Sequence, residues 1–181
     1  MIERDQLRRL ASLVKQRNAV DQEITGVLGR PALTGHLGEF IAARVFQIAL
    51  LESASHKGID GHFTNGPLAG RSVDVKFYTK NEGILDITLN APPDFYLVMT
   101  GPRTQAESSR GTTRPWVISS VFLFDASDLV HRLNRRGVKI GIATSVARHF
   151  WDDAEIYPRP SNPVLRPTPE QRSLLEMFGE R

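Results

Sequence analysis

The stretch from Gly58 to Lys80 constrains the fold most, because it reads as two extended runs joined by a turn that contains glycine and proline. In the second run, residues 71–80, the apolar side chains of Val73, Val75 and Phe77 alternate with polar ones. Alternation with a period of two predicts a half-buried strand that has one apolar face. We therefore expect these two runs to pair as a hairpin.

The other face of that strand carries Asp74 and Lys76, and Asp60 stands at the head of the neighbouring run. Side chains at i and i+2 of a strand lie on the same face, and cross-strand neighbours on that face are within contact distance. Two carboxylates and one ammonium group are thus expected to converge. They form either a cross-strand ion pair on a solvated face, or a divalent-metal site in which the lysine orients or activates water.

Length and composition limit the number of domains and the kinds of site and partner that this chain can have. A chain of 181 residues fits one domain with a modest appendage. The absence of cysteine excludes disulfides and zinc–thiolate sites. A formal charge of +3 permits a nucleic-acid partner without requiring one. The N-terminus contains acidic residues and no apolar core of signal-peptide length, and no later run is long enough to span a bilayer. We therefore expect no signal peptide, no membrane partner and a cytoplasmic location.

Helical spacing of apolar residues predicts a long amphipathic helix over 2–28 and a second, mostly buried helix over 35–51. The first helix presents a basic face that is simply solvated, makes a dimer contact or binds a nucleic-acid backbone. Arg17 and Asp21 interrupt its apolar stripe, which argues against a long coiled coil. Glu39 lies on an apolar stripe of the second helix, where a carboxylate is costly unless it is paired or bound to a cation.

The rest of the chain alternates short apolar runs with breakers. Strands are expected at 84–89, 95–99, 116–124 and 138–143, and helices at 125–136 and after Ser145. The polar segment 103–115 predicts a surface loop. Thr168 and Gln171 predict a capping box on a last helix, which docks on its own domain or on a second subunit.

Three short motifs now stand in order: GEF at 38–40, GID at 58–60 and VDVK at 73–76. Together they resemble the PD-(D/E)XK nuclease superfamily, whose members share the restriction-endonuclease-like fold. The resemblance covers roughly 34–101. Ile59 stands where the family has a proline, and no crossover helix is evident after the third motif.

The resemblance implies an α/β (α+β) domain over residues 1–156, with a mixed central sheet flanked by helices and an additional N-terminal helix. Residues 157–181 would follow as a proline-rich arm and a short helix.

The resemblance also implies a chemistry, that of a metal-dependent nuclease acting on nucleic acid, most simply DNA. Asp60 and Asp74 would hold Mg²⁺ or Mn²⁺, helped by the backbone carbonyl of Val75, and Glu39 would complete the site. Lys76 would position the attacking water and stabilise developing negative charge.

Basic and polar residues flanking this site are candidates for phosphate contacts: His56, Lys57, His62, Tyr78, Lys80, Arg103, Arg110 and Arg114. Two alternatives remain open. The same fold would serve as a nucleic-acid-binding module without turnover, or as an assembly subunit of a defence or restriction-type system. A homodimer through the N-terminal helix or the C-terminal arm is compatible with either.

Overall fold

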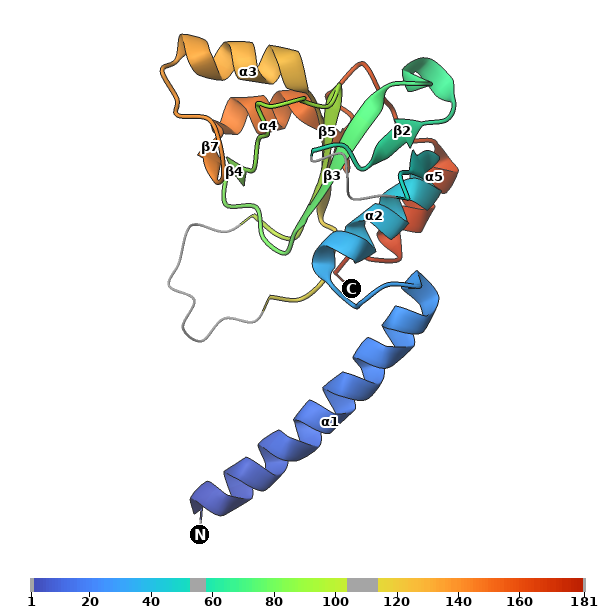
Figure 1. Cartoon of the computed structure of the whole chain (residues 1–181), viewed down its shortest axis with the longest axis vertical. Coiled ribbons are helices and arrows are strands. Elements are labelled where there is room, and N and C mark those ends of the chain that lie inside the picture. Colours follow the sequence, from blue (N-terminus) through green and yellow to red (C-terminus); the bar gives the residue numbers. More distant parts are fainter. Residues whose placement is uncertain (1, 53–57, 104–113, 181) are drawn as a thin grey trace.

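The computed structural model describes residues 2–52, 58–103 and 114–180. They form a mixed α/β fold around a six-stranded sheet of order β1-β2-β3-β5-β6-β8 (Figure 1). The strands of this sheet are β1 (Ile48–Leu50), β2 (Gly61–Phe63), β3 (Ser72–Tyr78), β5 (Phe95–Thr100), β6 (Ser120–Asp125) and β8 (Glu155–Tyr157). A separate two-stranded ladder pairs β4 (Ile84–Leu85) with β7 (Thr144–Ser145).

The described helices are α1 (Ile2–Leu28), α2 (Thr34–Val45), α3 (Ala126–Arg135), α4 (Arg148–Ala154) and α5 (Pro169–Glu176). Within the six-stranded sheet β3 and β5 run parallel, and the other neighbouring strands run antiparallel. The expected hairpin of β2 and β3 is therefore present. The chain crosses from β3 to β5 without a helix, as the sequence between these strands indicated.

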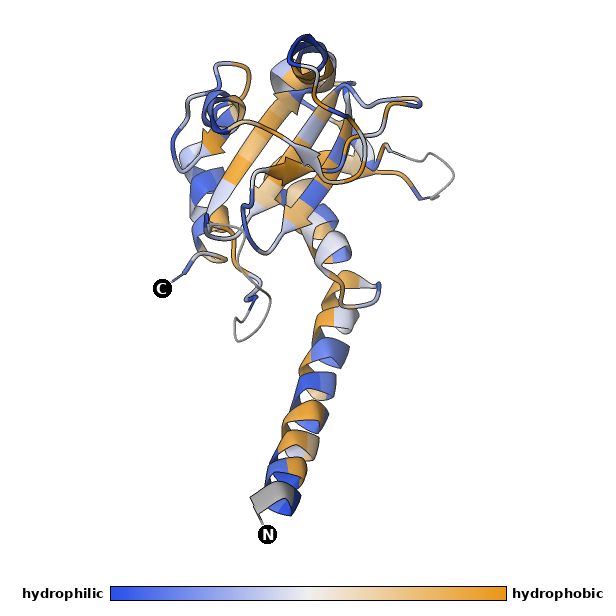
Figure 2. Ribbon diagram, turned by 90° about the vertical axis from the view of Figure 1, so that its left-hand side faces the viewer, coloured by the Kyte–Doolittle hydropathy of each residue, from blue (hydrophilic) through white to orange (hydrophobic). Residues whose placement is uncertain are grey.

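Helices cover both faces of the sheet (Figure 1). On one face, Val73, Val75 and Phe77 of β3 pack with apolar residues of α2 and α5. On the other face, aromatic and aliphatic residues of β5 and β6 pack with α3 and α4. Figure 2 shows that apolar residues dominate the central strands. The strict alternation along the strands separates the two clusters, since successive side chains point to opposite faces.

The second helix is shorter than the sequence pattern predicted. It ends at Val45 instead of residue 51, and residues 48–50 form the edge strand β1. The reason is Gln47, whose φ of 55° lies in the left-handed region and turns the chain out of the helix. The carbonyl of Gln47 then accepts the N–H of Thr64 at 2.9 Å, which ties this corner to the hairpin.

Three expected strands differ from the prediction. The run at 84–89 contributes only β4, the run at 116–124 is a strand over residues 120–125, and the run at 138–143 is irregular. In the last case φ is 54° at Ala143, and its N–H donates to the carboxylate of Asp86 at 2.7 Å. A side chain therefore satisfies the backbone there in place of a strand partner. The strand expected at 95–99 and the helix expected at 125–136 are confirmed within one residue.

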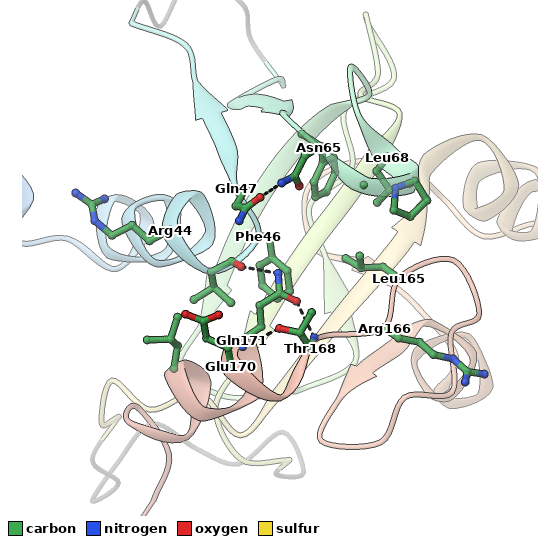
Figure 3. A pocket seen from close by; sticks show the side chains of 15 residues that line it. Arg44, Phe46, Gln47, Asn65, Leu68, Leu165, Arg166, Thr168, Glu170 and Gln171 are labelled. Carbon is green, nitrogen blue, oxygen red and sulfur yellow. Dashed lines mark hydrogen bonds between the residues drawn. The ribbon is translucent and has the colours of Figure 1, made fainter.

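The C-terminal segment packs on its own domain. Thr168 and Gln171 form the predicted capping box. The side-chain amide of Gln171 also donates to the carbonyl of Val45 at 2.7 Å, which joins α5 to the end of α2 (Figure 3). Leu175 is fully buried in the core. Between α2, the β1–β2 corner and α5 lies a cleft of about 360 Å³, whose lining includes Gln47 and Asn65.

The helix α1 leaves the body at α2 and projects away from it (Figure 1). Its predicted bounds, residues 2–28, are confirmed. Among the residues described, no helix combines the length and the apolar character that crossing a lipid bilayer requires.

Candidate functional site

The β2–β3 hairpin places Asp60 opposite Asp74. Gly61 pairs with Val73, so the preceding residue faces the following one across the ladder. The N–H of Asp60 donates to the carbonyl of Val73 at 2.9 Å, and its carboxylate Oδ2 accepts the N–H of Val75 at 2.7 Å. The Asp60 side chain thus takes over a backbone bond of β3 and is held against that strand.

Asp74 is buried, with 1% of its surface exposed. Its Oδ1 lies 2.8 Å from Nζ of Lys76, whose side chain is 26% exposed. Its Oδ2 is buried and has no hydrogen-bond partner among the residues that the structure describes. A buried oxygen left unsatisfied costs about 1–3 kcal/mol, and more when it carries charge. The ion pair observed runs along β3, and its carboxylate lies in the interior instead of on a solvated face.

Electrostatics at Asp74 favour a proton or a cation. Burial raises the pKa of Asp74 to about 7, and the neighbouring charge of Asp60 acts in the same direction while Lys76 opposes it. Near neutral pH the carboxyl group is therefore close to its titration point. A cation between the two aspartates would remove their repulsion and satisfy the buried oxygen.

Tyr78 and Tyr96 lie near Asp74, and Tyr96 contacts the β4–β5 connection. Tyr96 stands beside Asp74 in the parallel register, and its hydroxyl donates to the Thr88 carbonyl at 3.3 Å. Gly58, with φ of 91°, packs so closely on Thr88 that a Cβ there would lie 3.1 Å from its Cγ2. Burial raises the pKa of Tyr78 and of Tyr96, so both hydroxyls remain protonated.

Sequence reasoning did not assign Tyr96 and Thr88 to the site. The usable signal was a tyrosine inside the apolar run 95–99, since a buried tyrosine needs a partner for its hydroxyl group.

Glu39 does not join this group. The helix that carries it covers the opposite face of β3: a Cβ at Gly38 would lie 2.8 Å from Cβ of Phe77, a side chain that points away from Asp74. The carboxylate of Glu39 pairs instead with Arg30. Among the described residues no three side chains of the histidine, cysteine, aspartate or glutamate type are placed to hold a metal ion together. The expected convergence of three carboxylates is thus reduced to two.

The predicted phosphate-contacting residues fall in different places. His62 pairs with Ser72 on the face that Asp74 shares. Tyr78 and Lys80 line a surface cavity together with Arg114. Arg103 lies 3.8 Å from Asp152, at the far end of β5. Three others, His56, Lys57 and Arg110, lie outside the described residues.

Comparison with known proteins adds no assignment. No protein-family model matches the chain, and no match was found among curated proteins.

Proposed function

We propose that this protein is a divalent-cation-dependent nuclease that hydrolyses nucleic-acid phosphodiester bonds, most simply those of DNA, at Asp60, Asp74 and Lys76. The observation that carries the proposal is the buried, unsatisfied Oδ2 of Asp74 beside a second carboxylate. Burying a carboxylate oxygen without a partner is unfavourable even when the other oxygen is paired with a lysine. A cation bound between the two carboxylates would satisfy it.

The donor set fits a hard cation. Mg²⁺ and Mn²⁺ prefer carboxylate and carbonyl oxygens, and Mg²⁺ sites commonly use one or two carboxylates together with water and substrate phosphate. Asp60 and Asp74 supply two carboxylates. The Val75 carbonyl remains a predicted third ligand. When bound, the ion would supply Lewis-acid polarisation of the scissile phosphate.

The remaining steps belong to the chain itself. Lys76 bridges the interior and the surface, so its ammonium group is within reach of a phosphate or a water molecule on the open side. It would orient the attacking water and stabilise negative charge on the phosphate. Asp60, fixed by the Val75 N–H, would hold its carboxylate in one orientation without help from substrate.

The order of elements supports the same proposal. A helix precedes an antiparallel β1-β2-β3 unit. Asp60 comes just before β2, Asp74 lies on β3, and the buried strand β5 pairs with β3 on its other side. This is the order expected of the restriction-endonuclease-like fold. The site would then work with two acidic residues in place of three.

The decisive experiment incubates the full chain with plasmid, linear duplex and single-stranded substrates in Mn²⁺ or Mg²⁺. We expect the wild type to cut at least one of them, and Lys76→Ala to lose at least about 100-fold in rate, the scale of a positioned acid–base group. Exposed Lys139 provides a matched control: Lys139→Ala should cut like the wild type.

A second measurement reads the metal without activity. Mn²⁺ should raise the Tm of the wild type and leave that of Asp74→Asn unchanged, because ligand binding stabilises only a fold that holds the site. No cleavage together with no metal-linked rise in Tm would reject the nuclease proposal.

One observation favours a different function. Glu39 is neutralised by Arg30, and Lys76 already neutralises one oxygen of Asp74. A domain of this kind that only binds nucleic acid would retain a stable fold without a cation. Retention of duplex DNA by the wild type, without cleavage and without a metal effect, would identify that binding module.

A further inference from the structure

The helix α1 exposes apolar side chains along most of its length. Six of its aliphatic side chains are between 46% and 70% exposed: Leu7, Leu10, Leu13, Val14, Val20 and Val27. Figure 2 shows apolar residues recurring along the length of this projecting helix. The helix contacts the body chiefly at α2, where Ile24 and Leu28 are half-buried. Because most helical stability in proteins comes from packing of an amphipathic face, the six exposed side chains call for a partner.

Some of these side chains belong to an apolar stripe with a regular spacing. Leu7, Leu10 and Val14 follow one another at intervals of three and four residues, and Ile24 and Leu28 continue the same register. This is the a/d pattern of a heptad repeat. In the same register, Arg17 and Asp21 occupy the two positions between Val14 and Ile24, and they are the charged residues that interrupt the stripe.

We propose that the partner is a second copy of this chain, and that two α1 helices pair antiparallel through this stripe. Pairing Arg17 with Asp21 of the partner subunit fixes the register. Val14 then meets Ile24 of the partner subunit, and Leu10 meets Leu28 of the partner subunit. Apolar residues face apolar residues in the outer layers, and each of the two central layers matches a cation with an anion. Two-fold symmetry repeats each contact.

Charge complementarity favours this orientation over the parallel one. A parallel pair in register would set Arg17 against its own copy and Asp21 against its own copy, and like charges in a helix interface destabilise it. Within one helix the two side chains lie 3.5 Å apart with the arginine on the N-terminal side, which is the weaker order for such a pair. The pair therefore gains more by crossing to a second helix.

A second row of apolar residues supports the same orientation. Leu13, Val20 and Val27 recur every seven residues beside the stripe. In an antiparallel pair such flanking rows face each other, so that Leu13 approaches Val27 of the partner subunit and the two copies of Val20 meet near the two-fold axis. In a parallel pair this row would instead face the row that contains Asn18 and Thr25.

The same charges argue against a lipid surface as the partner. A helix that lies in a membrane interface keeps its charged residues on the opposite face. Arg17 and Asp21 lie in the middle of the apolar stripe, whereas Arg8, Arg9 and Lys15 lie on the other side of the helix. The stripe suits a surface that supplies a matching pair of charges.

The first test measures the mass of the full chain by light scattering and sedimentation. We expect a dimer at micromolar concentration. Arg17→Asp alone and Asp21→Arg alone should be monomeric, since each sets like charges together, with an increase in Kd of at least about 100-fold. An equimolar mixture of the two variants should form a heterodimer, because each chain then presents the opposite charge. Arg9→Asp, the same change on the outer side, should remain a dimer.

The second test determines orientation and uses the absence of cysteine from the sequence. Mixed Leu10→Cys and Leu28→Cys chains should form disulfide-linked heterodimers. Leu10→Cys alone should not cross-link, since 18 residues of helix would separate its two copies by about 27 Å. Cross-linking of Leu10→Cys with itself would establish a parallel pair and overturn the proposed one. A chain that stays monomeric up to about 100 µM would overturn the association altogether. Neither result depends on whether the protein cuts nucleic acid.

Discussion

Asp74 combines full burial with a neighbour of the same charge, and these two conditions both oppose its ionised form. Lys76 offsets part of that cost from one side only. Stability should therefore respond to the protonation of this single carboxyl group, and the response has a definite sign.

The folded-state pKa of Asp74, about 7, lies above its ordinary value of 3.8. Between these two values the folded chain holds a proton that the unfolded chain has lost. The free energy of unfolding should thus fall as pH rises from 4 to 7. The fall is about 1.4 kcal/mol for each unit by which the folded-state pKa exceeds the unfolded-state pKa. In urea titrations with EDTA, Asp74→Asn should lose this fall and be the more stable protein at pH 8.

Asp94 provides a control of opposite sign. Slight burial raises its pKa, but hydrogen bonds from Ser72 and the charge of Arg71 outweigh this and lower it overall. The stability that Asp94 contributes is present at neutral pH and lost as pH falls through its lowered pKa. Asp94→Asn should therefore lose stability at pH 7. If Asp74→Asn behaved in the same way, Asp74 would be a satisfied structural carboxylate and not a candidate ligand.

The sequence predicted the close approach of Asp60, Asp74 and Lys76 because a strand period of two and a hairpin register are local properties. It did not predict the position of Glu39. The side of a sheet on which a helix packs depends on which face is apolar. Here α2 packs on the face that carries Val73, Val75 and Phe77, which is opposite the face that carries the carboxylates. The periodicity of the helix contains no information about that choice.

At the scale of elements, the position of α2 depends on its close packing against β3. Gly38 lies over Phe77 without room for a side chain, so the helix and β3 come nearer than two ordinary residues would allow. The end of the same helix was not predictable, since the apolar run 46–51 suits a helix and an edge strand equally well. Gln47, which separates the two, has no sequence signature for its left-handed conformation.

Gly38→Ala should destabilise the protein by about 1–3 kcal/mol, the usual cost of overpacking a core. The reason is that the added methyl group would meet Cβ of Phe77 at 2.8 Å. Gly35→Ala on the same helix has open space around the new atom and should be neutral or slightly stabilising. Chemical denaturation of both variants checks the prediction. Equal stability of the two would show that α2 can shift away from β3 at little cost.

At the scale of the whole molecule, the structure separates into a three-layered body and a projecting helix (Figure 1). The body has its core on two faces of one sheet, and neither core cluster includes a residue of α1. Antiparallel pairing of two such helices would place the two bodies at opposite ends of a rod about 40 Å long. The two Asp60–Asp74 sites would then lie far apart, on separate bodies of one dimer.

The body should therefore fold without α1. A chain of residues 29–181 should unfold with a Tm within about 4 °C of the full chain, which corresponds to about 1 kcal/mol for a protein of this size. Thermal unfolding followed by circular dichroism of both chains measures this. A fall of more than about 10 °C would mean that α1 packs on the body in solution.

The two tryptophans of the sequence lie on opposite faces of the sheet. Trp151 is enclosed by Phe122 and Phe124, with ring centroids 4.8 and 5.0 Å away. Trp116 packs at the edge of the cluster that α2 and α5 cover. Replacing either one by phenylalanine leaves a single tryptophan, so tryptophan fluorescence can follow each half of the core separately, without an attached dye.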